Sequence, residues 1–180
     1  MKRMASIYAK LLRTHPTKTQ IATAGTMMLT SDIIAQKLIE RRKVLDVERT
    51  AGFFLIGICY VGPFMRTWFF VLDRYLVRGT GTSAAVKKML LDQLLVSPVY
   101  LFFFIGIRAA VQSFSWSVTK ETVKAKYVNA LALSYVIWPA AMAVNYRYVP
   151  LNYRILFTGV VGLAWGTCLS FKLSGPKPAL

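Results

Sequence analysis

Charged side chains interrupt the apolar stretches of this sequence at four places. They are Asp32, Arg66, Asp92 and Arg108. On insertion scales a charge at the centre of a bilayer costs about 2.5–3.5 kcal/mol, so such residues usually face a cavity or an opposite charge. Gln36 follows Asp32 by one helical turn and therefore shares its face. We expect these groups to line a polar cavity or ion path, in which Arg66 pairs with an aspartate.

A purely structural role is the alternative for such residues. Asp92 and its neighbour Gln93 lie near the start of one apolar stretch, and Arg108 lies toward its end. Side chains in such places can reach the membrane interface, and polar groups inside spans can hydrogen-bond adjacent helices. The sequence leaves both roles open. The pore-lining or buried polar candidates are Asp32, Gln36, Arg66, Asp92 and Gln93.

Catalytic and metal-binding chemistry find little support in the sequence. The one histidine is His15, and the two cysteines, Cys59 and Cys168, lie inside apolar stretches without the spacing of metal ligands. The sequence has no nucleophile elbow, phosphate-binding glycine loop or dinucleotide fingerprint. We therefore expect a protein that is not an enzyme and holds no metal or cofactor, with both thiols serving as small packing groups.

Five apolar blocks carry the candidate residues. They cover roughly 18–39, 50–72, 88–112, 127–146 and 153–171. A helix needs about 20 mostly apolar residues to cross the hydrocarbon core, and short connections favour antiparallel neighbours. The pattern predicts an all-α, multi-pass transmembrane helix bundle of four to five spans, in which the first block is the least certain span. We expect a single membrane domain over 16–174 and a short tail over 175–180.

Prolines and small residues are expected to shape this bundle. Pro63, Pro98 and Pro139 each lie inside a block and each removes a backbone N–H, so we expect three kinked spans. Kinks together with buried charges favour a pore over an inert anchor, although kinks that only shape packing are the alternative. Close helix packing, within the chain or between copies in a homo-oligomer, is expected at Gly57, Gly62, Trp138, Gly162 and Gly166.

Residues 1–15 are predicted to form a basic amphipathic helix. One helical face carries Met4, Ile7, Tyr8, Leu11 and Leu12, and no acidic residue occurs before Asp32. Such a segment is typical of mitochondrial import signals, and a basic helix lying on an anionic membrane surface is the alternative. We expect the segment to be retained, because no cleavage site is evident.

The net charge of +16 first suggests a nucleic-acid partner, but 56% of the residues are hydrophobic and the mean hydropathy is +0.47. Soluble nucleic-acid binders are rarely so apolar. The basic residues gather in the N-terminal helix, the connections and the tail. We therefore expect contacts with anionic lipids and no direct binding of nucleic acid. Positive charge is divided almost evenly between the two sides, so the positive-inside rule gives no orientation.

The sequence resembles the Mpv-seventeen / peroxisomal-membrane-protein family over nearly its whole length, and within it the mitochondrial inner-membrane founder most closely. The matching stretches are HPTKTQIATAGTMMLTSDIIAQKLIERR at 15–42, VGPFMRTWFFVLDRYL at 61–76, KKMLLDQ at 87–93 and WPAAMAVNYRYVPLNYR at 138–154. Three positions depart from the family pattern: Ser31 replaces a glycine, Met142 a glutamine and Tyr146 a phenylalanine.

The resemblance implies a multi-pass protein of the mitochondrial inner membrane that acts as a weakly selective channel for small solutes or ions. It also implies links to membrane potential, oxidative stress and the maintenance of mitochondrial DNA and nucleotides. A peroxisomal membrane pore is one alternative. The other is a non-conducting membrane scaffold that recruits partners through its basic loops, especially Arg41-Arg42-Lys43.

Overall fold

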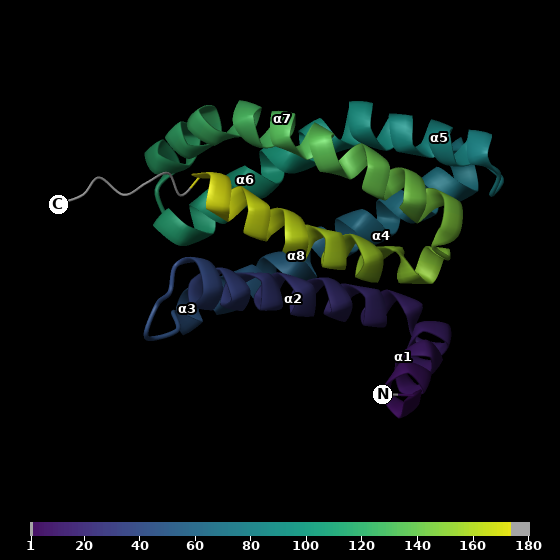
Figure 1. Cartoon of the computed structure of the whole chain (residues 1–180), viewed down its shortest axis with the longest axis horizontal. Helices are drawn as coiled ribbons and strands as arrows, with labels where there is room; N and C mark the ends of the chain where they lie inside the picture. The colour runs from purple at the N-terminus through teal and green to yellow at the C-terminus, as the bar shows by residue number, and fades with distance from the viewer. Residues whose placement is uncertain (1, 174–180) are drawn as a thin grey trace.

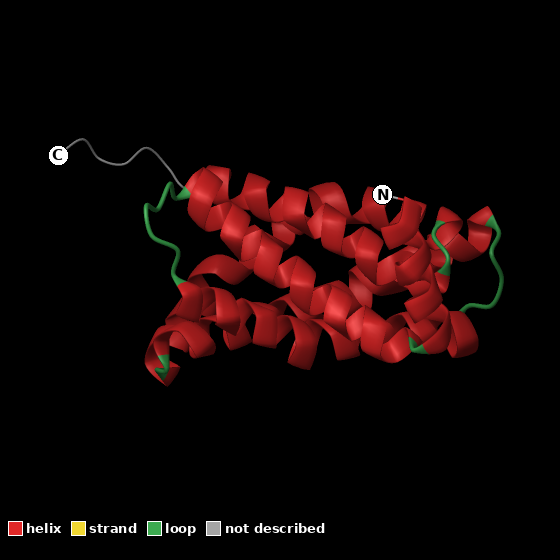
Figure 2. Cartoon of the chain, turned by 90° about the horizontal axis from the view of Figure 1, so that it is seen from below, coloured by secondary structure: helices red, strands yellow, loops and turns green. Residues whose placement is uncertain are grey.

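The computed structural model describes the backbone of residues 2–173, and the predicted tail at 175–180 lies outside the described residues. All regular elements of the described part are helical (Figure 2), in agreement with the predicted all-α class. In chain order they are α1 (Lys2–Thr14), α2 (Pro16–Ile34), η1 (Ala35–Ile39), α3 (Val47–Ile56), η2 (Gly57–Val61), α4 (Gly62–Val71), η3 (Leu72–Leu76), α5 (Thr82–Leu91), η4 (Asp92–Val96), α6 (Ser97–Ser113), α7 (Trp116–Tyr148), η5 (Leu151–Tyr153) and α8 (Arg154–Leu173).

Three continuous helical segments of the described chain are long and apolar enough to cross a membrane. They are Val47–Leu76 with 30 residues, Thr82–Ser113 with 32 and Trp116–Tyr148 with 33. Only 28%, 11% and 17% of their most apolar windows, respectively, are buried inside the molecule, as expected of helices that also face lipid. The further spans predicted over 18–39 and 153–171, which correspond to α2 and α8, stay predictions.

Two π turns lie directly before prolines that the sequence singled out. The turn η2 ends at Val61, just before Gly62-Pro63, and η4 ends at Val96, just before Ser97-Pro98. A proline cannot donate a backbone hydrogen bond and its ring crowds the preceding turn, and a π turn widens the helix locally. Both spans therefore continue through their prolines as one helix, whereas Pro139 lies inside α7 without a π turn.

The long helices run along the long axis of the molecule, and the connections lie at its two ends (Figure 1). Helix α2 packs against α3, η2, α4 and α8, while α7 packs against α5, α6 and α8. The loop after η1 and the α6–α7 connection share one end, and the connections before α5 and before α8 share the other. The buried core between these helices includes Ala24, Phe69, Leu72, Met142 and Tyr146.

Helix α1 folds against α2 at the N-terminal end of the bundle (Figure 1). Leu12 is buried, and the Tyr8 hydroxyl lies 2.9 Å from the Thr23 hydroxyl of α2. Ile7 and Leu11, from the same predicted apolar face, are exposed. The apolar face of α1 is thus divided between the bundle and the surroundings, which suits a helix at a membrane surface.

Candidate transport cavity

A cavity of about 240 Å³ lies between the helices and is lined by residues from α2, α3, α4, α6, α7 and α8 and from three π turns. Of the residues predicted to line a pore, Asp32, Asp92 and Gln93 lie on its wall. Gln36 and Arg66 are not among its lining residues. Two polar centres, one around Asp32 and one around Asp92, therefore contribute to the wall of this cavity.

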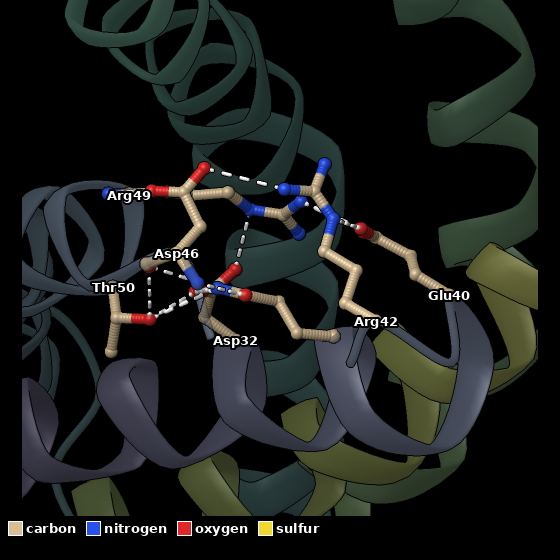
Figure 3. A network of polar contacts seen from close by, with 7 residues as sticks. Asp32, Glu40, Arg42, Asp46, Arg49 and Thr50 are labelled. Atoms are coloured by element: carbon tan, nitrogen blue, oxygen red, sulfur yellow. Dashed lines mark hydrogen bonds and ion pairs between the residues drawn. The ribbon is translucent and has the colours of Figure 1, made fainter. Parts of the chain in front are cut away.

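The Asp32 centre joins α2 to the start of α3 (Figure 3). Arg49 Nε donates to Asp32 Oδ1 at 2.8 Å, and Thr50 Oγ1 donates to Asp32 Oδ2 at 2.7 Å. Gln36, one turn along α2, donates to the same Oδ2 from Nε2 at 2.6 Å. Asp32 is 1% exposed. The carboxylate is thus ion-paired and hydrogen-bonded on both oxygens, which is the condition for burying a charge.

Gln36 fastens the loop that follows η1. Its side-chain Oε1 accepts a hydrogen bond from the backbone N–H of Asp46 at 2.7 Å, and its Nε2 donates to the backbone oxygen of Asp46 at 3.2 Å. Asp46 in turn caps α3, since its Oδ1 accepts from the backbone N–H of Arg49 at 3.0 Å. Such a cap typically contributes about 1 kcal/mol. Gln36 therefore holds the loop to α2 and does not itself line the cavity.

Glu40 carries the network outward to the loop (Figure 3). Its carboxylate pairs with Arg49 Nη1 and with Arg42 Nε, each at 2.8 Å. Partial burial raises the pKa of the Glu40 carboxyl, but the hydrogen bonds and charges of Arg49 and Arg42 outweigh it and leave this pKa below its usual value. Arg49 consequently bridges two carboxylates, one at the cavity wall and one in the loop.

The Asp92 centre joins three helical segments. Trp68 Nε1 donates to Asp92 Oδ1 at 2.6 Å, and the Tyr146 hydroxyl donates to the same oxygen at 2.9 Å. Gln93 Nε2 donates to Asp92 Oδ2 at 2.7 Å. All three donors are neutral, so this carboxylate is held by hydrogen bonds without a cation in direct contact. The Oε1 atom of Gln93 is buried and has no hydrogen-bond partner among the described residues.

Arg66 makes a different contact from the one expected of it. Its Nη1 donates to Gln20 Oε1 at 3.0 Å, and Gln20 Nε2 donates to Asn152 Oδ1 at 3.3 Å. The expected pairing of Arg66 with an aspartate is wrong, because the cation beside Asp32 is Arg49. Arg66 instead links α4 to α2 and to the turn before α8.

A second group of charges, in which Lys88 and Arg154 are buried, lies outside the cavity lining and was missed by sequence reasoning. Asp73 Oδ1 is 2.7 Å from Lys88 Nζ and 2.9 Å from Arg154 Nη1. Both contacts are ion pairs without good hydrogen-bond geometry. The Arg154 guanidinium also lies 5.1 Å from the centre of the Tyr146 ring. The only sequence signal was the position of these charges at the ends of apolar blocks, where they resembled interfacial residues.

Close helix packing occurs where glycines of different helices meet. A Cβ on Gly57 would lie 2.6 Å from the Cα of Gly25, and a Cβ on Gly62 would lie 2.9 Å from the Cα of Ile21. These short distances allow α2 to approach the second span closely. Gly162 instead lines the cavity and has no described atom within 4 Å of a built Cβ. The packing around Gly166 lies outside what the structure describes.

Trp138 is a wall of the cavity as well as a packing residue. It lies against the buried core, and its ring is 6.3 Å from that of Trp165 in an edge-to-face arrangement. Edge-to-face pairs of this kind contribute about 0.5–1.5 kcal/mol beyond their buried area. Across the described part of the chain, no group of three or more His, Cys, Asp or Glu residues is placed to hold a metal ion.

Comparison with known proteins gives consistent matches. The model of the Mpv17 / PMP22 family matches residues 109–170. A Xenopus laevis protein named mitochondrial inner membrane protein Mpv17 is 39% identical over 167 residues, which are 92% of this chain and 94% of the relative. The human protein of the same name is 37% identical over the same shares, and PXMP2/4 family protein 2 of Dictyostelium discoideum is 34% identical over 94% of this chain and 91% of its own. No solved structure matches the chain.

Proposed function

Since the chain belongs to the Mpv17 / PMP22 family and is a mitochondrial inner-membrane protein, we propose that it is a weakly selective channel for small solutes or ions. The observation that carries this proposal is the cavity between the helices, whose wall includes two charged centres. Charges are expensive inside a membrane and mark solute pathways when they face a cavity. The long apolar helices, of which only a small share is buried inside the molecule, would supply the surface toward lipid.

The positions of Asp92 and Arg108, two cavity-lining residues of one span, support a path along the bundle axis. Asp92 follows the start of its span at Thr82 by about 15 Å, and Arg108 precedes the end of the same span at Ser113 by about 8 Å, at 1.5 Å per residue. Much of the cavity wall is apolar and includes Met27, Met28, Met65, Tyr100, Phe104 and Trp138. An apolar constriction can gate a channel by excluding water, and flexible methionines can change its width.

In the mitochondrion this channel would let small solutes or ions cross in response to membrane potential. We extend the proposal to the physiological roles that the family resemblance implies, namely modulation of membrane potential, support of mitochondrial DNA and nucleotide homeostasis, and the oxidative-stress response. Anionic lipids and a second copy of the chain are proposed as its partners in the bilayer.

Planar bilayers test the proposal directly. We expect purified protein to give conductance, and we expect Asp32→Asn and Asp92→Asn to change the reversal potential in a salt gradient. The exposed Glu121 of α7 offers a matched control, because Glu121→Gln removes a carboxylate that does not line the cavity. Silent bilayers at several voltages, with insertion demonstrated, would contradict the proposal.

A non-conducting scaffold is the second candidate, and the loop after η1 favours it. Arg41 and Lys43 are exposed there, and Arg41 adopts a positive φ of 52°, a conformation uncommon for a residue with a side chain. Reversing the charge of Arg41 and Lys43 together should abolish cellular function under this alternative while leaving any conductance intact. Arg42 is unsuitable for this test because it pairs with Glu40.

A further inference from the structure

Arg108 presents an unpaired cation to the cavity. It lies on α6 and lines the cavity near the end that also holds Arg49 and Glu40. Its guanidinium carbon is 4.9 Å from the centre of the Phe53 ring, and that of Arg49 is 5.8 Å from the same centre. Arg108 makes no salt bridge with any described residue. An aromatic ring attracts the guanidinium charge without satisfying its N–H groups.

The acidic groups on the cavity wall are already occupied. Asp32 uses both oxygens for Arg49, Thr50 and Gln36, and Glu40 uses both for Arg49 and Arg42. Asp92, also on the cavity wall, accepts three hydrogen bonds. The carboxylates on the cavity wall are therefore already bound by donors of the protein. The Arg108 guanidinium, in contrast, is paired with none of these carboxylates and can meet a solute.

Arg108 is partly buried, and an arginine cannot become neutral by losing its proton, so a charged partner for its free N–H groups would be favourable. The planar fork of donors matches the oxygens of a phosphate or carboxylate group. We propose that Arg108, with Arg49 beside it, binds the oxyanion group of a small solute and gives the channel a preference for anions. This inference rests on the proposed channel function and names its solute class.

The size of the cavity narrows that class further. A volume of about 240 Å³ lies below the range of roughly 300–1,000 Å³ typical of pockets for drug-sized ligands. Inorganic phosphate or a short carboxylate fits this space. Phe53, Tyr100 and Phe104 on the wall would face the apolar part of such a carboxylate.

Binding is tested first without any need for conduction. The full chain in lipid-free detergent is titrated with inorganic phosphate at constant ionic strength, with chloride as the reference anion, and thermal unfolding is followed. We expect a saturable rise in melting temperature. Arg108→Gln should weaken phosphate binding about tenfold to a hundredfold, as expected for the loss of charge-assisted hydrogen bonds, and Arg108→Lys should retain part of it. Arg74→Gln, at an exposed arginine outside the cavity, should bind as the unaltered chain does.

Selectivity is tested next in bilayers with a gradient of potassium chloride and then of potassium phosphate. The unaltered chain should show a reversal potential on the anion side, and Arg108→Gln should move it toward the cation side while Arg74→Gln leaves it in place. Conductance with a cation preference that Arg108→Gln does not alter would overturn the inference and leave the channel function standing. Absence of conductance would overturn the channel function. The phosphate titration would still show whether Arg108 binds an oxyanion.

Two binding outcomes would also overturn the inference. One is the absence of phosphate stabilisation in the unaltered chain, a result that depends on no variant and therefore on no variant's folding. The other is stabilisation by phosphatidic acid in mixed micelles but not by inorganic phosphate, which would assign Arg108 to a lipid headgroup instead of a transported anion.

Discussion

Arg49→Gln is the substitution that tests the Asp32 centre most severely. It leaves Asp32, which is 1% exposed, without its cation, although the hydrogen bonds from Gln36 and Thr50 remain. Removing one partner of a buried ion pair costs about 3–5 kcal/mol. Because the Arg49 side chain is 16% exposed, we expect the lower end of this range, about 3 kcal/mol. At about 2–4 °C per kcal/mol for a chain of this length, the melting temperature should fall by about 6–12 °C.

Thermal unfolding in a single detergent, at neutral pH and fixed salt, measures this effect. The double variant Asp32→Asn/Arg49→Gln removes both charges and should recover most of the loss, since no uncompensated charge remains. Arg74→Gln is the matched control at an exposed site and should change the melting temperature by less than about 2 °C. An Arg49→Gln variant as stable as the unaltered chain, or a double variant as unstable as the sum of the single ones, would refute the reasoning.

Three further predictions follow from contacts elsewhere in the molecule, each measured by thermal unfolding. Tyr146→Phe removes one donor to the buried Asp92 carboxylate and should cost about 1.5–3 kcal/mol, whereas Tyr148→Phe at an exposed position should cost little; equal effects would contradict the role of the hydroxyl. Glu40 has a lowered pKa in the folded chain, so its contribution to stability is full above the unfolded-state pKa and is lost as the pH falls through the folded-state pKa. The difference in melting temperature between the unaltered chain and Glu40→Gln should therefore shrink in acid. A difference that grows in acid would contradict the lowered pKa. Gly57→Ala places a Cβ 2.6 Å from backbone and should cost about 1–3 kcal/mol, whereas Gly162→Ala, with open space, should be tolerated; the opposite order would contradict the packing.

The local features of this fold were predictable because they depend on neighbours in the chain. The helical class follows from the apolar blocks, and the shared face of Asp32 and Gln36 follows from their spacing of one turn. The predicted block at 50–72 lies within the observed segment Val47–Leu76. The π turns at Gly57–Val61 and Asp92–Val96 were not predicted, since the helical periodicity of the sequence does not distinguish one widened turn from an α-helix.

The long-range pairings could not be predicted from residue types alone. Arg49 lies beyond the apolar block that carries Asp32 and meets it only because the loop Glu40–Asp46 returns α3 alongside α2. Arg66 lies inside an apolar block and was therefore expected to pair with an aspartate within the membrane, yet the packing of α4 brings it to Gln20. Which cation meets which carboxylate depends on the rotation and register of packed helices, and these are set by contacts such as Gly25 against Gly57.

Import of the chain into mitochondria has a separate expected outcome. Residues 1–20 fused to a soluble reporter should direct it to mitochondria, because the segment is basic, amphipathic and free of acids. A diffuse reporter would show that the signal lies elsewhere in the chain.

The central claim is that the cavity between these helices conducts, and current through a planar bilayer tests it most directly. Purified protein, with its insertion established independently, should produce conductance that depends on voltage and that Asp92→Asn alters in ion preference. Bilayers that contain the inserted protein and stay silent across the voltage range would contradict the claim.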